Sequence, residues 1–322
     1  MTISRRQFLS VASASFTGTM LSAPLSHLLS SAAQGLPTHT HHYGPLIRDP
    51  QGMLDLPRGF QYRILSREGQ KMSDGFPVPA KHDGMAAFAG PQRTTILVRN
   101  HELGSDQSPA VQGVNPYDPK SKGGTTTLVI DRDRKLLRDY ASLTGTTRNC
   151  GGGATPWGSW ISCEENTDTP ESEPAVSKRH GYAFEVPSQA TGPIQPQPLI
   201  AMGRFYREAV AVDPKTGIVY QTEDREDGLF YRFIPHRPGQ LQAGGLLEAL
   251  KIKGKPQAIT KKGFPVGKSW PVEWVPIDNP DPDTDSIRQE GFAKGAAQFM
   301  RGEGSLFGAK RRIASFAAPS GG

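Results

Sequence analysis

Short apolar runs bounded by turn-forming residues constrain the fold of this chain more than any other feature of its sequence. From Leu54 onward, no window of about 12 residues keeps the 3.6-residue period of an amphipathic helix. Runs of four to six residues rich in β-branched and aromatic side chains occur instead, as is typical of strands. The clearest are 94–98, 125–130, 160–163, 182–186, 209–212, 217–220 and 229–233. The sequence therefore predicts an all-β fold.

Turn-forming residues between these runs predict antiparallel hairpins. In residues 213–217 (Asp-Pro-Lys-Thr-Gly) the proline presets φ, the aspartate can close a turn and the glycine can take a left-handed conformation. We expect a similar turn at 131–134. Many short hairpins fit a β-sandwich or a β-propeller, and acidic segments that reappear after the strands favour the propeller, whose blades feed a central pocket. Residues 288–300 predict either the one helix or a turn leading into a strand.

Composition and charge exclude several classes of protein. The 36 glycines and 28 prolines make up about a fifth of the 322 residues, below the share of roughly 25–30% typical of disordered chains. No apolar run approaches the roughly 18 residues of a membrane span, so we expect no stable membrane insertion. The net charge of +6 is small and its basic residues are spread out, which argues against nucleic acid as a partner. Cys150 and Cys163 can form one disulfide, but their spacing fits no zinc pattern.

The first 33 residues have the order of an export signal. Arg5 and Arg6 precede a mildly apolar stretch at 11–23, and small residues follow near 31–33. The paired arginines resemble a bacterial twin-arginine signal. The alternative, an amphipathic helix of the folded domain, is disfavoured because the segment has no acidic residue. We therefore expect residues 1–33 to engage the twin-arginine export machinery, residues 34–53 to form a linker and N-terminal arm, and the mature chain to be periplasmic or extracellular.

Acidic clusters follow several of the predicted strands. Adjacent carboxylates repel and prefer water, so any single cluster is compatible with a hydrated loop. Their recurrence favours a cation site, because Ca²⁺ takes six to eight oxygen ligands that separate loops can supply. The sequence has no EF-hand loop, so the prediction of calcium depends on the acidic clusters alone. They are 99–102, 162–166, 222–227, 289–291 and 301–304.

Residues 149–153 (Asn-Cys-Gly-Gly-Gly) form the other unusual segment. Glycines let the backbone pass close to a ligand or metal, and the Cys150 thiolate would bind a soft or borderline ion. A flexible loop with an inert thiol remains an alternative. Glu208, at the entrance of a predicted strand, can point into a pore or face water. Motifs of serine hydrolases, zincins and nucleotide-binding folds are absent from the sequence.

Eleven short motifs follow one another between about residues 43 and 304. They are 43–46, 54–60, 72–77, 82–85, 99–102, 149–152, 163–166, 180–182, 207–210, 222–224 and 301–304. In this joint order they resemble the PhoX-type alkaline phosphatase family of secreted bacterial proteins, with which the twin-arginine signal agrees. The resemblance implies a six-bladed β-propeller, here over residues 54–304. It also implies a central cluster of iron and calcium ions, and hydrolysis of phosphate monoesters by metal-assisted in-line displacement.

The resemblance also implies roles for particular residues. Cys150 resembles the thiolate ligand of an iron, with Glu208 and Glu303 as further ligands of the cluster. Arg301 resembles the arginine that binds the substrate phosphate, and Asn100 would assist it; the role of Glu102 stays open. The positions that resemble calcium ligands are Glu164, Glu165, Glu223 and Asp224.

The C-terminal segment departs from the family pattern. Family members continue after the Arg-x-Glu-Gly motif with aromatic-rich strands, whereas residues 305–322 form an atypical tail that ends in Ser, Ala, Pro and Gly. We therefore expect an incomplete propeller with exposed sheet edges, and weak folding or lost activity unless a second polypeptide completes it. Two other functions stay open: a calcium-dependent esterase or lactonase that does not need Cys150, and a non-catalytic propeller of the cell envelope that binds a polyanion or a partner protein.

Overall fold

The computed structural model describes residues 43–265, 267–308 and 312–317, which fall into two compact units divided after Ile64. The expected export signal lies outside the described residues. The first unit contains a two-stranded antiparallel sheet, β1 (Leu46–Ile47) with β2 (Leu56–Pro57). Asp49 closes the loop between them, because it accepts hydrogen bonds from the Tyr62 hydroxyl at 2.7 Å and from three backbone N–H groups. The Tyr62 hydrogen bond, followed by those from the backbone, lowers the pKa of Asp49 to about 2.

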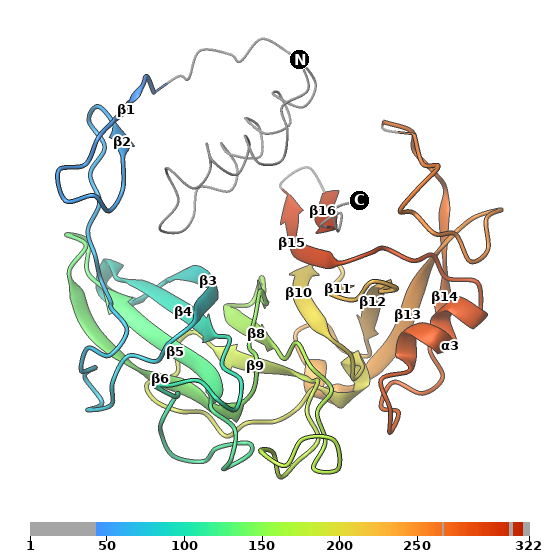
Figure 1. The fold of residues 1–322 in the computed structure, drawn as a ribbon, viewed down its shortest axis with the longest axis horizontal. Coiled ribbons are helices and arrows are strands. Elements are labelled where there is room, and N and C mark those ends of the chain that lie inside the picture. The colour runs from blue at the N-terminus through green and yellow to red at the C-terminus, as the bar shows by residue number, and fades with distance from the viewer. Residues whose placement is uncertain (1–42, 266, 309–311, 318–322) are drawn as a thin grey trace. The chain divides into compact units, whose positions relative to one another are not determined.

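The second unit is built from antiparallel sheets whose strands follow one another in the sequence (Figure 1). The first sheet has β3 (His82–Ala89), β4 (Thr95–His101), β5 (Gly123–Ile130) and β6 (Leu136–Thr146). The second has β7 (Gly153–Ala154), β8 (Ser159–Cys163) and β9 (Ala183–Pro187). The third has β10 (Arg207–Val212), β11 (Val219–Glu223), β12 (Phe230–Pro235), β13 (Gly245–Ile252) and β14 (Val272–Pro276). The last has β15 (Gly302–Gly308) and β16 (Arg312–Ala317).

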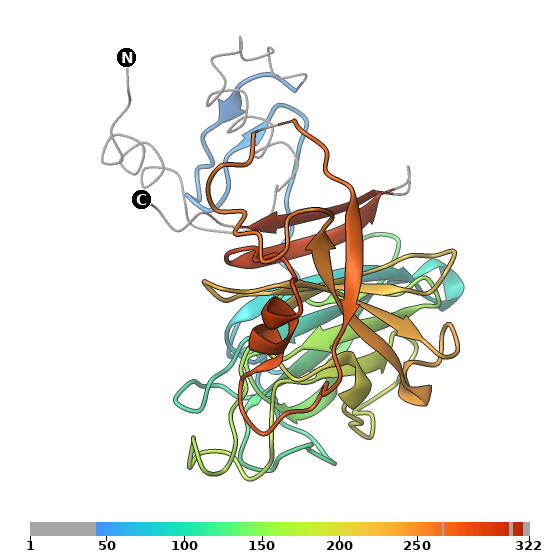
Figure 2. The same ribbon diagram turned by 90° about the vertical axis from the view of Figure 1, so that its right-hand side faces the viewer.

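The first strands of these four sheets lie next to one another. β3 contacts β7, β7 contacts β10, and β10 contacts β15. A parallel bridge between Gly152 and Ala209 joins the start of the second sheet to the third. The sheets therefore meet along their first strands, and the strands that follow β3 and β10 lie further out in Figure 1; Figure 2 shows the same sheets turned by 90°.

The structure confirms the strands and hairpins expected from the local patterns. Each of the seven apolar runs overlaps a strand, so the mostly β fold is confirmed. In the β10–β11 turn, Asp213 accepts hydrogen bonds from the Lys215 N–H and the Thr216 hydroxyl, and Gly217 has a φ of +72°. The turn expected at 131–134 joins β5 to β6, with Arg134 at a φ of +62°.

Helical structure in the described part of the chain is short. The 3₁₀ segments are η1 (Pro91–Arg93), η2 (Ile200–Met202) and η3 (Leu241–Ala243). The α-helix, α3 (Ile287–Ala293), covers only the first half of the segment for which a helix was one alternative, and Gly295 follows at a φ of +98°. None of the helices in the described residues has the length and apolar character needed to span a bilayer.

Both cysteines lie in the hydrophobic core between the second and third sheets. Cys150 and Cys163 pack with Ile161, Val210 and Met202, all of them buried. Both thiols are free, so the disulfide that the sequence allowed does not form. Packing in this core fixes the start of β7 against β10.

Candidate functional site

Two glycines bring the Cys150 segment close to its neighbouring strands. A Cβ atom on Gly84, in β3, would lie 1.9 Å from the carbonyl oxygen of Gly151. A Cβ atom on Gly151 would lie 2.7 Å from Oε1 of Glu208. Larger residues would clash at both positions, so glycine is what permits the approach. Gly151, one of the glycines expected to let the backbone pass close to a ligand or metal, brings the backbone beside a carboxyl group.

One thiol and two carboxyl groups meet at this approach. Ligand atoms of Cys150, Glu165 and Glu208 all lie within 4.8 Å of one another, and we call these residues the Cys150 cluster. Cys150 is buried three residues before β7, Glu165 follows β8, and Glu208 belongs to β10. The Cys150 Sγ lies 3.1 Å from the carbonyl oxygen of Arg207 and 3.2 Å from that of Glu208. Main-chain geometry therefore holds the sulfur at the entrance of β10.

Burial opposes charge on the members of the Cys150 cluster. Burial, followed by the charge of Glu208, raises the pKa of the Cys150 thiol well above its usual value. Burial and the charge of Glu165 raise the pKa of Glu208 to about 8. Burial and a hydrogen bond with Asp224 raise the pKa of Glu165 to about 7. A cation bound here would reverse these shifts, because it stabilises the ionised forms.

Further carboxyl groups reach the same place from the other first strands. Asp83 lies in β3 and Glu303 in β15, and the charges of both raise the pKa of Glu208. Burial also raises the pKa of Asp83 and of Glu303. Asp224 follows β11 and hydrogen bonds to Glu165. Each of the four sheets thus contributes an acidic or thiol group at or near its first strand.

Two arginines adjoin these acidic groups. The Arg148 Nη2 lies 3.6 Å from Oε1 of Glu102 and 3.6 Å from Oε2 of Glu165. The Arg301 Nε lies 2.7 Å from Oδ1 of Asp224. The side chains of Arg148 and Arg301 are 46% and 42% exposed, whereas that of Asp224 is 7% exposed. The guanidinium groups therefore lie closer to solvent than the carboxylates they contact.

The chemistry of this donor set fits metal ions. Carboxylate oxygens suit hard cations such as Ca²⁺, and a thiolate suits softer ions such as iron. The acidic groups of the Cys150 cluster, with Asp83, Asp224 and Glu303, repel one another and outnumber the two arginines. Buried acidic groups without enough positive partners are what a cation site requires.

Comparison with known families covers most of the chain. The family model described as alkaline phosphatase PhoX matches residues 41–315. The chain belongs to the PhoX alkaline phosphatase family. This confirms the resemblance based on the order of the short motifs, and it places the chain among phosphomonoester hydrolases. A search of curated proteins gives no match.

Glu164 lies apart from the Cys150 cluster of this PhoX-family chain. Its Oε1 accepts hydrogen bonds from the Thr147 N–H at 3.1 Å and from His180 Nδ1 at 2.6 Å. Its Oε2 accepts from the backbone N–H groups of Gly181 and Tyr182. The predicted calcium position at Glu164 therefore holds a carboxylate with four protein partners.

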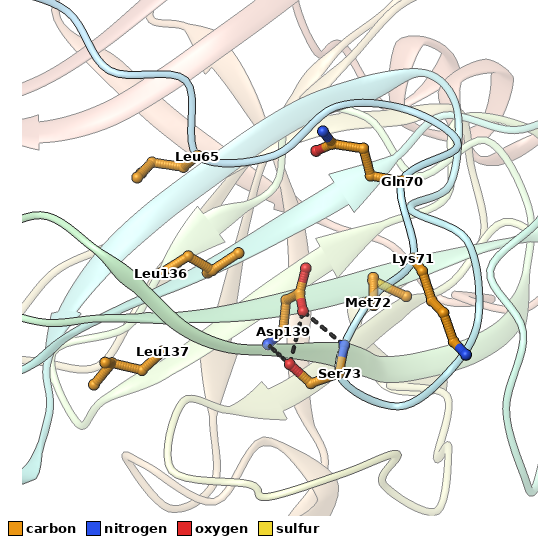
Figure 3. Close-up of a pocket in the computed structure, with 8 residues that line it drawn as sticks. All are labelled: Leu65, Gln70, Lys71, Met72, Ser73, Leu136, Leu137 and Asp139. Atoms are coloured by element: carbon orange, nitrogen blue, oxygen red, sulfur yellow. Dashed lines mark hydrogen bonds between the residues drawn. The ribbon is translucent and has the colours of Figure 1, made fainter.

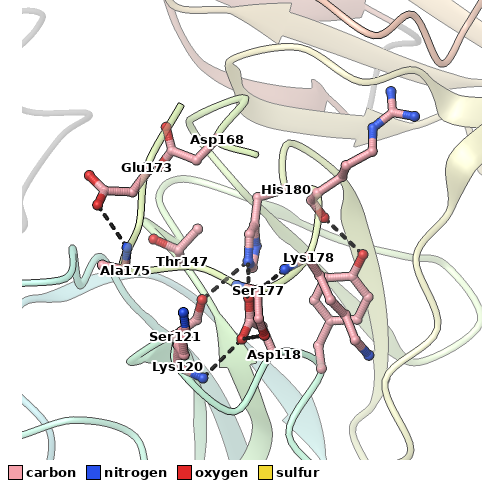
Figure 4. A network of polar contacts seen from close by, with 12 residues as sticks. Asp118, Lys120, Ser121, Thr147, Asp168, Glu173, Ala175, Ser177, Lys178 and His180 are labelled. Atoms are coloured by element: carbon pink, nitrogen blue, oxygen red, sulfur yellow. Dashed lines mark hydrogen bonds and ion pairs between the residues drawn. The ribbon is translucent and has the colours of Figure 1, made fainter. Parts of the chain in front are cut away.

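His180 links Glu164 to a second buried carboxylate. The His180 Nε2 lies 3.3 Å from Asp118 Oδ2 and 3.1 Å from the Ser121 hydroxyl (Figure 4). The side chains of Glu164, His180 and Asp118 are all fully buried, and we call them the His180 network. Burial lowers the pKa of His180, but Glu164 and Asp118 outweigh it and raise the pKa above the usual value.

Glu223 also points away from the Cys150 cluster. Its Oε2 accepts hydrogen bonds from the Leu229 N–H at 2.9 Å and the Tyr231 hydroxyl at 2.7 Å, and Arg288 lies 3.7 Å from Oε1. Burial raises its pKa to about 7. Successive side chains of an extended strand point to opposite faces, so Asp224 faces Glu165 while Glu223 faces β12 and α3.

Asn100 is hydrogen bonded to the backbone of Cys150. Its side-chain amide donates a hydrogen bond to the carbonyl oxygen of Cys150. Its Oδ1 accepts from Trp160 Nε1 and from the Ser162 hydroxyl, both at 2.8 Å. The side chain is fully buried, so the structure gives Asn100 a positioning contact with Cys150.

Two residues near the cluster were not among the predicted site residues. Asp83 stood within the motif at 82–85, but a lone aspartate in a strand carried no separate signal. Arg148 directly precedes Asn149, and its pairing with Glu102 and Glu165 depends on contacts between distant segments. Glu102, whose role was open, is tied to the site through Arg148 and raises the pKa of Asp83, after the larger effect of burial.

A groove of about 520 Å³ lies elsewhere in the second unit (Figure 3). Its polar side is closed by Asp139, whose carboxylate accepts hydrogen bonds from the Ser73 N–H at 2.8 Å and the Ser73 hydroxyl at 3.0 Å. None of the carboxyl or thiol groups of the Cys150 cluster lines it. The groove residues are Leu65, Gln70, Lys71, Met72, Ser73, Leu136, Leu137 and Asp139.

Proposed function

We propose that this chain is a metal-dependent phosphomonoesterase whose centre is built on the Cys150 cluster. One observation carries the proposal: the sulfur of Cys150 and the carboxylate oxygens of Glu165 and Glu208 lie within 4.8 Å of one another, in a chain whose family hydrolyses phosphomonoesters. A hydrated acidic loop would not bury a thiol among carboxyl groups that repel one another. Bound cations would offset this repulsion by neutralising the charges of the carboxylates and the thiolate.

The donor types suggest which ions are held. Cys150, Glu208 and Glu303 would hold iron, because a thiolate favours a softer ion. Glu165 and Asp224 would hold calcium, together with Asp83, which the family resemblance did not single out. Glu164 and Glu223 are left out of this ligand set. Protein donors occupy both oxygens of Glu164 and the Oε2 of Glu223, and the Oε1 of Glu223 lies 3.7 Å from Arg288.

The remaining residues would bind and orient the ester. When bound, the ions would supply positive charge that stabilises the transferring phosphoryl group. Arg301, part-exposed beside Asp224, would grip phosphate oxygens through its planar fork. Asn100 would keep the Cys150 carbonyl, and so the thiol, in position. Water would attack the phosphorus in line with the ester oxygen, so that a new P–O bond forms as the ester P–O bond breaks and the products are phosphate and the alcohol.

We also propose that the sheets of the second unit are blades of a β-propeller. The contacts of β3 with β7, β7 with β10, and β10 with β15 support this, because the first strands of propeller blades line a shared centre. The acidic groups gather at these same strands. A twin-arginine signal at residues 1–33 would send the folded, metal-loaded chain to the periplasm or outside the cell.

The test is metal content measured together with hydrolysis of p-nitrophenyl phosphate. The full chain is purified after twin-arginine export without chelator, and the same sample is then stripped of metal and reloaded with iron and calcium. We expect turnover that disappears on stripping and returns on reloading. Equal turnover by the stripped sample would reject the proposal.

A further inference from the structure

Arg148 and Arg301 share an unusual backbone conformation. Their φ angles are +48° and +53°, in the left-handed region that side chains other than glycine disfavour. Strained conformations of this kind cluster at functional sites. The Arg148 N–H and carbonyl oxygen are both anchored, by hydrogen bonds with Leu103 and Glu165. The fold therefore holds this arginine in a strained conformation beside the Cys150 cluster.

The two arginines each contact one of two carboxyl groups that interact with each other. Arg148 contacts Glu165 and Arg301 contacts Asp224, and the Asp224 carboxyl group acts on Glu165. Both guanidinium groups are almost half exposed. Arg148 is thus placed beside Glu165 much as Arg301 is placed beside Asp224.

The contacts of Arg148 are loose ones. Its ion pairs with Glu102 and Glu165 are both 3.6 Å long, whereas charge-assisted hydrogen bonds are about 2.7–2.9 Å. Cations that neutralise Glu165 would weaken one of these pairs further. A guanidinium whose carboxylate partner is taken by cations, and which is close to solvent, is suited to bind an anion through its fork.

We propose that Arg148 is a second phosphate-binding residue, which acts together with Arg301 at the acidic groups of the site. This rests on the proposed phosphomonoesterase function. A monoester phosphate carries up to two negative charges and a diester one, so a second guanidinium favours the monoester. Arg148 therefore contributes to the preference for monoesters as well as to affinity for phosphate.

A role limited to balancing Glu102 and Glu165 makes a different prediction. Loss of Arg148 would then alter metal content and kcat, and would leave affinity for phosphate and KM unchanged. A phosphate-binding role instead weakens phosphate affinity and raises KM at unchanged metal content. The two roles are therefore separated by binding measurements that do not depend on turnover.

The test uses the metal-loaded full chain with the variants Arg148→Ala, Arg148→Lys and Arg301→Ala. Arg232→Ala is the control, because Arg232 is ion-paired at 2.6 Å with Glu248 between β12 and β13, away from the acidic groups of the site. Calorimetry gives the Kd for inorganic phosphate. Kinetics give KM for p-nitrophenyl phosphate and for bis-p-nitrophenyl phosphate, and mass spectrometry gives metal content.

We expect Arg148→Ala to weaken phosphate binding about tenfold, which corresponds to about 1.4 kcal/mol. It should also lose more kcat/KM on the monoester than on the diester, while Arg232→Ala stays at the wild-type value. Arg148→Lys keeps a positive charge beside Glu102 and Glu165, so it tests the phosphate-binding role if the alanine variant does not fold. It should weaken phosphate binding because it lacks the planar fork.

Failure of the inference and failure of the proposed function give different results. Wild-type phosphate affinity in the folded Arg148 variants would leave Arg148 as a partner of carboxylates only. If wild type hydrolyses esters and only Arg301→Ala weakens phosphate binding, the inference fails while the proposed function stands. A wild-type chain that binds phosphate through Arg148 but does not hydrolyse esters would support the inference and reject the function. A metal-loaded wild-type chain that binds no phosphate rejects both.

Discussion

Glu164 and Glu165 are neighbours in the sequence, but they lie in opposite environments. Glu164 belongs to the His180 network, where each of its oxygens has two protein donors. Glu165 belongs to the Cys150 cluster, where a thiol and another carboxyl group surround it and Arg148 lies 3.6 Å away. Glu164 has four protein hydrogen-bond donors, whereas the neighbours of Glu165 are other acidic groups, a thiol and one arginine at 3.6 Å.

The difference separates structural from functional carboxylates. A buried charge with protein donors stabilises the fold when nothing else is bound, and removing one partner leaves the others unsatisfied. Buried carboxyl groups that face one another stay protonated or recruit a cation. Residue type alone therefore does not separate structural from functional carboxylates. The direction of the side chain does.

The largest expected effect is on catalysis, through Glu208→Gln. Glutamine keeps the size of the side chain but removes the charge that a cation would need. Since changes even to residues that only support a ligand cost about 10–100-fold, kcat/KM for p-nitrophenyl phosphate should fall by at least about 100-fold with loss of metal. Glu248→Gln, in β13, is the control and should keep both. Full activity in Glu208→Gln would place the metal centre elsewhere.

Glu164→Gln should act on stability instead. It breaks a buried charge pair with His180, and such losses cost about 3–5 kcal/mol. Urea unfolding in the presence of chelator gives the free energy of unfolding without any contribution from metal. A change under about 1 kcal/mol would mean that the His180 network does not stabilise the fold in the way the contacts imply.

Asp118 should make the stability that the His180 network contributes depend on pH. Although burial raises its pKa, hydrogen bonds led by the Ser177 hydroxyl outweigh burial and lower the pKa to about 2. Its stabilising effect is therefore present above its ordinary pKa, near 4, and is lost as the pH falls toward 2. Asp118→Asn should lower the free energy of unfolding by about 1–3 kcal/mol at neutral pH. The difference in free energy of unfolding between wild type and variant should shrink over that acid range. A difference that grows there would contradict a stabilising role of the Asp118 carboxylate.

The smallest effect is expected from Glu165→Gln in metal-free protein. Removing a carboxyl group from the Cys150 cluster relieves repulsion, so the free energy of unfolding should stay constant or rise by about 1 kcal/mol. This is opposite in sign to the effect at Glu164. Equal losses of stability from Glu164→Gln and Glu165→Gln would remove the distinction between the two regions.

Local patterns in the sequence predicted seven of the strands, because such strands and turns depend on residues close together; β3, β6 and β13 were not among them. The apolar run at 209–212 and the turn at 213–217 are examples, and both appear in the β10–β11 hairpin. The segment around Cys150 also stood out, since glycines are needed where Gly84 and Gly151 approach each other.

The direction of adjacent side chains could not be predicted in the same way. Glu164 and Glu165, like Glu223 and Asp224, offer two acidic residues at a strand end, and strand register decides which one faces the centre. Arg148 reaches the site through a left-handed backbone conformation that nothing in its neighbouring residues demands. Such features depend on packing between sheets far apart in the sequence.

The central claim is that the Cys150 cluster holds metal, and the two cysteines test it most directly. Both are fully or almost fully buried in the same core, but only Cys150 has ligand atoms of Glu165 and Glu208 around it. Metal content is therefore measured for Cys150→Ser and for Cys163→Ser, each expressed and purified as the wild-type chain. We predict that Cys150→Ser loses its iron while Cys163→Ser keeps it. Iron retained in Cys150→Ser, or lost equally from both folded variants, would contradict the account.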